Sequence, residues 1–188
     1  MPRNAAVFML ILSLTLSLAE ASMAGWDPNE QKAREREAIS TIDRFKEEDP
    51  QLDTFFASAY GYAVFPTVSK AGMGMGGAYG KGVVFQRGLL SAMEPKVVGF
   101  ASLTQLTMGF QFGAQAYSEI IFFKDKQAIE EFKKGNYELN AQASAVAVKK
   151  GASRNADYSQ GVAIFTLPKG GLMAEASVGG QKFSFEPL

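Results

Sequence analysis

The sequence predicts an α+β fold, in which N-terminal helices and one inserted helix accompany an antiparallel, strand-rich sheet or a partly closed barrel. Three observations predict it. Apolar residues recur with a helical period before residue 60, side chains alternate with a period of two over much of residues 62–123, and a capped helical segment follows at residues 125–134. The chain has 188 residues, a length typical of one domain.

The composition is globular and excludes several kinds of site. Hydrophobic residues make up 47% of the chain and charged residues 20%, and 19 basic residues balance 19 acidic ones. A net charge of zero argues against broad electrostatic capture of nucleic acid. Since the chain has no His and no Cys, it cannot hold a zinc, copper or haem group through those ligands, and it cannot build a Ser-His-Asp triad or a disulfide. We therefore expect no cofactor.

Residues 1–24 read as a secretory signal peptide. Arg3 precedes an apolar run over residues 5–19, and small residues follow it, so that cleavage is expected after Ala21 or Ala24. The alternative is a membrane anchor, but a spanning helix needs about 20 apolar residues and this run is shorter. We expect an exported protein, periplasmic or secreted, at the periphery of a membrane. Its mature part would comprise a helical arm over residues 25–60 and a globular unit over residues 61–188.

Two helices are expected in the arm. Asp27 suits the N-cap of the first helix, and Asp49-Pro50 should end it. A second, short helix should follow. Each helix has an apolar stripe typical of a buried helix face. The first consists of Ala38, Ile39, Ile42 and Phe45, and the second of Leu52, Phe55, Phe56 and Ala59, which have the spacing i, i+3, i+4, i+7.

A glycine-rich stretch over residues 71–85 is the least ordinary feature of the sequence. A strand over residues 62–65 should end at Pro66, and from Gly72 to Gly82 every even position is then Gly or Ala. Read as a strand or bent hairpin, this stretch has one face of bare backbone. Because glycine weakens a strand, the bare face predicts close approach of another backbone, a helix or a ligand. The other face carries Met73, Met75, Tyr79, Lys81 and Val83.

The remaining strands follow the same period. Residues 97–101 form one expected strand, and residues 104–123 a second that is too long to stay straight, so a bend is expected near Gly113. Asp125 should cap a helix that Gly135 ends, with Glu130 paired to Lys134. Further strands are expected over residues 143–148, 162–167, 172–178 and 182–185, with hairpin turns at Gly170-Gly171 and Gly179-Gly180.

Two motifs of known chemistry are tested and set aside. Residues 72–77 match G-x-G-x-x-G, but a dinucleotide site needs a helix to begin there, and strand-like residues follow instead. Glu119 is a carboxylate on the polar face of residues 104–123 without an acidic neighbour in the sequence, so a two-carboxylate mechanism is not visible. A structural, hydrogen-bonded carboxylate is the competing interpretation of Glu119.

Several ordered blocks of the chain resemble the SYLF domain family. They are residues 61–66, 76–84, 113–121, 132–147 and 171–183, and the resemblance extends over most of the chain from about residue 35. It implies a non-enzymatic lipid-binding module for anionic phospholipids or phosphoinositides. Fungal and animal members also bind actin, a partner that is not expected for an exported protein. Many bacterial members are lipoproteins, and this chain lacks the Cys that a lipoprotein requires.

The resemblance places lipid contact at Lys70, Lys81 and the glycines between them, Gly72, Gly74 and Gly76. Acyl chains would then meet Met73, Met75 and Tyr79. The competing interpretation is that the lysines are solvated and the methionines belong to the core. Three functions stay open: a lipid-binding module, a small outer-membrane β-barrel or envelope structural protein, and a hydrolase that uses Glu119. The sequence does not decide which lipid binds or how many chains associate.

Overall fold

The structure, a computed structural model, describes residues 28–88, 94–139, 145–178 and 180–188. The expected signal peptide and the N-cap Asp27 lie outside the described residues. The chain divides into two units, residues 1–33 and residues 34–188. The contacts that follow belong to the second unit.

Three helical segments open the described chain, the two helices that the sequence predicts and a 3₁₀ turn between them that it does not. They are α2 (Pro28–Glu48), the 3₁₀ turn η2 (Pro50–Leu52) and α3 (Asp53–Ser58), and the break falls at Asp49-Pro50. The expected stripe of α2 is wrong at Ile39, whose side chain is 47% exposed. Thr41 is buried there instead, and its hydroxyl donates to the carbonyl of Glu37 at 2.8 Å. The buried face therefore follows the spacing from Ala38 through Thr41 to Phe45.

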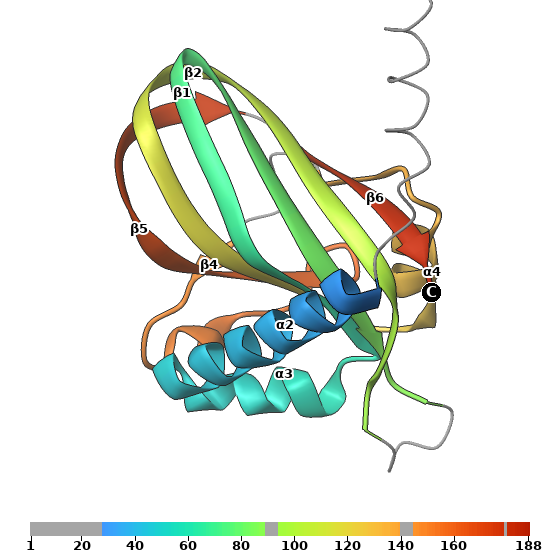
Figure 1. Cartoon of the computed structure of the whole chain (residues 1–188). Helices are drawn as coiled ribbons and strands as arrows, with labels where there is room; N and C mark the ends of the chain where they lie inside the picture. Colours follow the sequence, from blue (N-terminus) through green and yellow to red (C-terminus); the bar gives the residue numbers. More distant parts are fainter. Residues whose placement is uncertain (1–27, 89–93, 140–144, 179) are drawn as a thin grey trace, which may run out of the picture. The chain divides into compact units, whose positions relative to one another are not determined.

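The described strands form one curled, six-stranded sheet in the shape of a half-barrel (Figure 1). Strands β1 and β2 are its longest members, β5 and β6 flank β2, and β3 and β4 lie at the edges. Neighbouring strands pair antiparallel except β4 with β5, which pair parallel. Their bounds are β1 (Gly61–Gln86), β2 (Lys96–Phe123), β3 (Tyr137–Leu139), β4 (Val146–Ala147), β5 (Val162–Val178) and β6 (Gln181–Pro187). The predicted α+β fold is confirmed.

The long strands are nested around a common bend. β1 turns back at Gly74, whose φ is 76°, so that its two halves lie side by side and Arg87 N donates to Tyr60 O at 3.0 Å (Figure 1). β2 follows this outline. Its second half pairs with the first half of β1, and its first half pairs with the second half of β1. β5 and β6 then pair with the outer sides of β2. The expected bend of β2 lies at Gly109 and Gly113, which both have positive φ.

Several predicted strand ends are wrong because proline and glycine sit inside strands as irregularities. β1 continues through Pro66, where its register with β2 shifts between Phe65 and Val68. β5 continues through Gly170-Gly171, where the register also shifts, so no hairpin turn lies there. A bulge absorbs the missing N–H of proline and the unusual φ of glycine without ending a strand. The second predicted turn includes Gly179, which lies outside the described residues.

The inserted helix α4 (Lys126–Lys133) has the predicted cap. Asp125 Oδ1 accepts from Ala128 N at 2.9 Å, and Gly135 follows the helix with a φ of 76°. The predicted pair of Glu130 with Lys134 is wrong. Glu130 pairs with Lys133 at 3.0 Å, and Lys134 pairs with Glu131. The i, i+3 spacing also brings side chains together on a helix.

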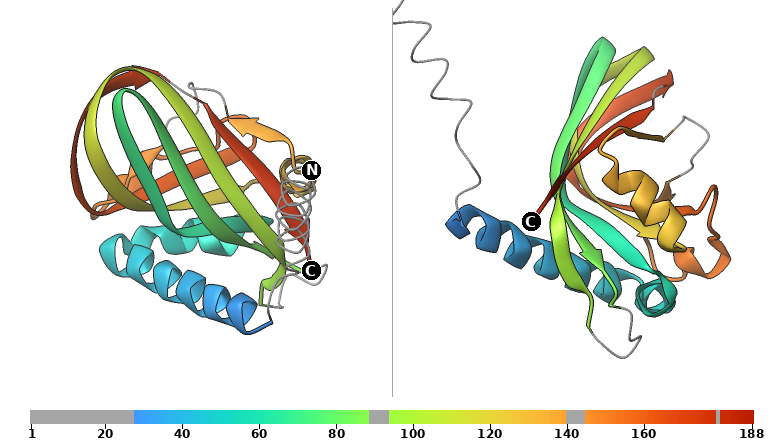
Figure 2. Two further views of the ribbon diagram at one scale, coloured as in Figure 1. Left: turned by 45° about the horizontal axis from the view of Figure 1, so that its top comes forward. Right: turned by 90° about the vertical axis from the view of Figure 1, so that its right-hand side faces the viewer.

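Helices cover both faces of the lower sheet (Figure 2). On one face Phe55 and Phe56 of α3 pack against Phe122, with ring centroids 5.5 and 4.8 Å apart. On the other face Phe132 of α4 contacts Phe123 and Phe183 at 4.9 and 5.3 Å. The core therefore sits at the helix end of the sheet, and the bend of the nested strands projects beyond it. Among the described residues, none of the helices combines the length and apolarity needed to cross a bilayer.

Candidate functional site

Five large apolar side chains are exposed where β1 and β2 bend, and we call them the apolar tip. Their exposed fractions are 78% for Met73, 70% for Met75, 83% for Leu106, 69% for Met108 and 62% for Phe112. Isolated exposed apolar residues are ordinary, but a group of them on one surface marks a contact site.

Strand register gathers the apolar tip. Met73 pairs with Phe112, Met75 with Met108 and Gly77 with Leu106. Side chains that are directly opposite in an antiparallel pair lie on the same face of the sheet. The five side chains therefore share one face around the bend that is drawn at the top of Figure 1.

The opposite face of the same strands is buried and carries polar side chains among apolar ones. Lys70, Thr107 and Glu119 are 8%, 2% and 1% exposed, and Val68 and Leu103 are buried with them. Near the bend, therefore, large apolar side chains face outward while several polar ones face inward. Such an arrangement is suited to an apolar medium outside the protein.

Glu119 is the most strongly perturbed acid among the described residues. Its Oε2 accepts from Gln181 Nε2 at 2.9 Å, and its Oε1 is buried without a hydrogen-bond partner. Burial raises the pKa of Glu119 to about 7, against the smaller lowering effect of the Gln181 hydrogen bond. The carboxyl links β2 to β6 inside the curled sheet.

The bare face of β1 is closely packed at only part of its length. A Cβ added to Gly80 would lie 2.8 Å from Val68 Cγ2, and one added to Gly82 would lie 2.7 Å from the ring of Phe65. These contacts are the predicted close approach of backbone. At Gly74 the packing explanation is wrong, because a Cβ there would meet nothing within 4 Å. Gly74 is required by its positive φ instead.

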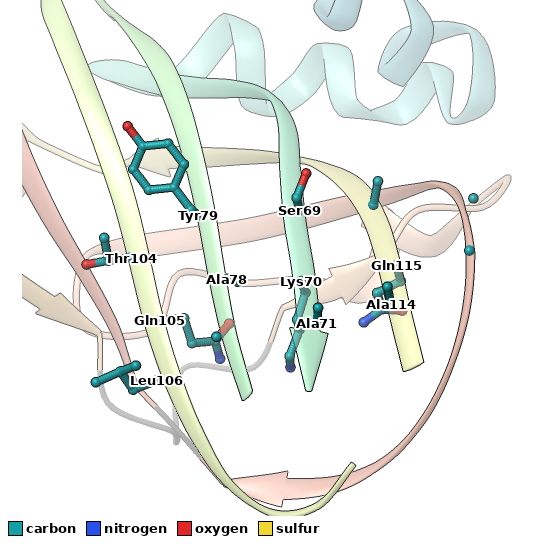
Figure 3. A pocket seen from close by; sticks show the side chains of 14 residues that line it. Ser69, Lys70, Ala71, Ala78, Tyr79, Thr104, Gln105, Leu106, Ala114 and Gln115 are labelled. Carbon is teal, nitrogen blue, oxygen red and sulfur yellow. The ribbon is translucent and has the colours of Figure 1, made fainter. Parts of the chain in front are cut away.

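The structure does not bring Lys70 and Lys81 together. Alternation along β1 buries Lys70 on the inner face and exposes Lys81 on the outer face. Lys70 and Tyr79 line an open groove of about 690 Å³ that crosses five neighbouring stretches of strand. In Figure 3 the side chains of Ser69 and Tyr79 point to the side on which helices α2 and α3 lie, and Lys70 points away from it.

Lys81 lines a second, smaller pocket of about 250 Å³. Arg34, Glu37 and Thr67 also line it. Lys169 reaches the same place, since its Nζ donates to Thr67 Oγ1 at 2.7 Å. Three cationic side chains and one carboxylate therefore gather around Thr67, a balance that suits an anionic group.

Sequence reasoning placed Met73, Met75 and Tyr79 in the site but missed Leu106, Met108 and Phe112. The three missed residues share one face of residues 104–123, as their alternation in the sequence indicates. The sequence does not indicate how this segment pairs with β1. It therefore does not show that this face is continuous with the face of β1 that carries Met73 and Met75. The described residues contain no group of three or more His, Cys, Asp or Glu side chains placed to hold a metal ion.

Two comparisons relate the chain to known proteins. Residues 104–187 match the family model Ysc84, described as Las17-binding protein actin regulator. The chain is also similar to Beta cell expansion factor A of Aeromonas veronii, with 30% identity over 146 residues. That alignment covers 78% of this chain and 53% of the relative, so the chain spans about half the length of the curated protein it matches.

Proposed function

We propose that this protein is an exported, non-enzymatic module that binds membrane lipid, because residues 104–187 match the Ysc84 or SYLF family, which is broadly associated with lipid or actin binding. The family resemblance favours anionic phospholipids or phosphoinositide-like head groups as the ligands. Actin stays an unexpected partner, because the proposed export separates the protein from it.

The apolar tip is the observation that carries the proposal. Fully burying one Leu, Phe or Met side chain stabilises a complex by about 1.5–3 kcal/mol. Five such side chains together can offset a substantial part of the association cost, about 4–15 kcal/mol. The tip presents them at one projecting end of the sheet, clear of the helices that cover its lower part (Figure 1).

The spacing along β1 matches the layers of a bilayer. From Met75 to Tyr79 a strand rises about 13 Å, and from Met75 to Lys81 about 20 Å. One leaflet of the hydrocarbon core is about 15 Å thick. With the tip inserted, Tyr79 would therefore lie near the interface that Tyr side chains prefer. Lys81 would lie at the level of the phosphate groups.

The proposal is tested by co-sedimentation with liposomes of neutral and anionic composition. Leu106→Ser with Phe112→Ser should reduce the bound fraction severalfold on both compositions, since each substitution removes roughly 1.5–3 kcal/mol of apolar burial. Ile39→Ser and Leu188→Ser are the matched controls, because these apolar side chains are exposed elsewhere, at 47% and 69%. Equal loss in the controls, or full binding by the tip variant, would refute insertion of the tip.

The head-group contact is tested separately at Lys81. Lys81→Glu should weaken binding to anionic liposomes and leave binding to neutral ones unchanged, and added salt should reduce the difference by screening. Lys70 does not serve this test, because a buried charge reversal would disturb folding first. If Lys81→Glu binds both compositions like the wild type, the second pocket plays no part in lipid binding.

Export and the absence of catalysis are part of the same proposal. Mass spectrometry of the exported protein should show an N-terminus after Ala21 or Ala24, and an intact apolar run would contradict it. The carboxyl of Glu119, the residue considered for hydrolysis, is buried and bonded to Gln181. This position supports a structural role, since a substrate has no access to it.

A further inference from the structure

Three of the five side chains of the apolar tip are methionines, and their arrangement suits a soft metal ion. Met73 and Met75 are separated only by Gly74, and Met75 pairs directly with Met108 across the two strands. All three side chains are at least 69% exposed. This cluster is independent of the lipid contact, because lipid insertion requires apolar bulk and has no requirement for sulfur.

The backbone brings the three thioethers within reach of one ion. Directly paired residues have Cβ atoms about 4.5–5.5 Å apart, which covers Met75 and Met108. Residues two apart on a strand lie about 6.6 Å apart, and the turn at Gly74 keeps Met73 beside Met75. Methionine has three rotatable side-chain bonds, so three such side chains can converge without moving the backbone.

The chemistry of the ligands selects the ion. Thioether sulfur is a soft, neutral donor that favours Cu(I) and disfavours Mg²⁺ and Ca²⁺. The chain has no His or Cys to compete for such an ion. We propose that Met73, Met75 and Met108 form a binding site for one soft monovalent cation of the Cu(I) and Ag(I) class. Binding involves no electron transfer and no proton release, since thioethers carry no proton.

Titration of the purified protein with Ag(I), the redox-stable probe, tests the proposal by calorimetry and by NMR of ¹³C-labelled methionine methyl groups. The expected result is one ion per chain, with shifts of the Met73, Met75 and Met108 signals. Met73→Leu, Met75→Leu and Met108→Leu combined should lower the affinity by about tenfold or more, since loss of even a second-shell partner costs about 10–100-fold. Ca²⁺ should produce no shift.

The controls separate this site from the lipid contact. Leucine conserves volume and apolarity, so the triple variant should keep its fold, which thermal unfolding checks. Leu106→Ser with Phe112→Ser should lose liposome binding and keep Ag(I) binding. The proposal is overturned if the triple variant binds Ag(I) as the wild type does, or if the shifts spread equally over Met93 and Met173. Failure of liposome binding alone would leave the metal site standing.

Discussion

Asp49 fixes the end of α2 to a loop that is distant in sequence. Its buried carboxylate accepts from Ser153 N and Oγ at 2.8 and 2.7 Å, from Gly151 N at 3.1 Å and from Gln51 N at 3.3 Å. Burial alone raises the pKa of Asp49, but the hydrogen bonds of Ser153, Gly151 and Gln51 outweigh it and hold the pKa below its usual value. The carboxylate anchors the 3₁₀ turn η3 (Ala152–Asn155) beside the helices.

Removing this anchor should destabilise the fold. Asp49→Ala leaves buried N–H groups without a partner, so the free energy of unfolding should fall by about 2–4 kcal/mol. Because the pKa of Asp49 is depressed in the folded protein, its contribution is present at neutral pH and is lost as the pH falls through that folded value. Urea unfolding at pH 7 measures the change. Asp43→Ala, at an exposed carboxylate of α2, is the control and should change stability by less than about 0.5 kcal/mol.

Glu119 should have the opposite pH dependence. Its folded pKa of about 7 lies above the usual 4.5. Below pH 4.5 the carboxyl is neutral in both states. Between pH 4.5 and 7 the unfolded state loses its proton first, so the free energy of unfolding falls, by about 3 kcal/mol in total. Glu119→Gln has no carboxyl to ionise at this position and therefore lacks this loss of stability. The free energy of unfolding of the variant, relative to that of the wild type, should rise between pH 5 and pH 8. A difference that is constant with pH would show that Glu119 is ionised in the fold.

At the scale of the element, the two kinds of glycine in β1 should respond differently to alanine. Gly82→Ala places a Cβ against Phe65 and should cost about 1–3 kcal/mol or more through overpacking. Gly74→Ala meets no atom within 4 Å, and only its positive φ opposes the change, at a cost of about 1 kcal/mol. Thermal unfolding of the two variants compares them. If Gly82→Ala and Gly74→Ala lowered the stability equally, the two halves of β1 would have to separate readily.

The elements that the sequence predicted well are those with local signals. The breaks at Asp49-Pro50 and Gly135 and the cap at Asp125 depend on neighbouring residues only, and they are confirmed. The ends of strands were predicted poorly. Pro66 and Gly170-Gly171 end a strand in isolation, but pairing with β2 carries β1 and β5 through them as irregularities. Pairing of that kind is set by residues far away in the sequence.

At the scale of the whole molecule, register explains what sequence reasoning could and could not find in the site. Lys70 and Lys81 are an odd number of residues apart, so alternation along β1 already places them on opposite faces, as the structure shows. Their positions on either side of the glycine run nevertheless make them look like flanks of a single site. The strand register, which the sequence does not reveal, hides the fact that Leu106, Met108 and Phe112 complete the apolar tip.

The nesting of the strands also has a consequence for the order of folding. The innermost hairpin is local, since β1 turns on itself at Gly74, whereas β6 pairs Gln181 with Gln105 and therefore closes a long loop. Loop-closure entropy makes such distant pairs form late, and a topology rich in them folds slowly. We expect amides of residues 61–86 to gain protection before those of residues 181–187 in pulsed hydrogen exchange during refolding. Simultaneous protection would show that the sheet condenses in one step. If the order holds, a chain truncated before β6 should still form the inner hairpin, and the pairing of β6 with β2 completes the sheet.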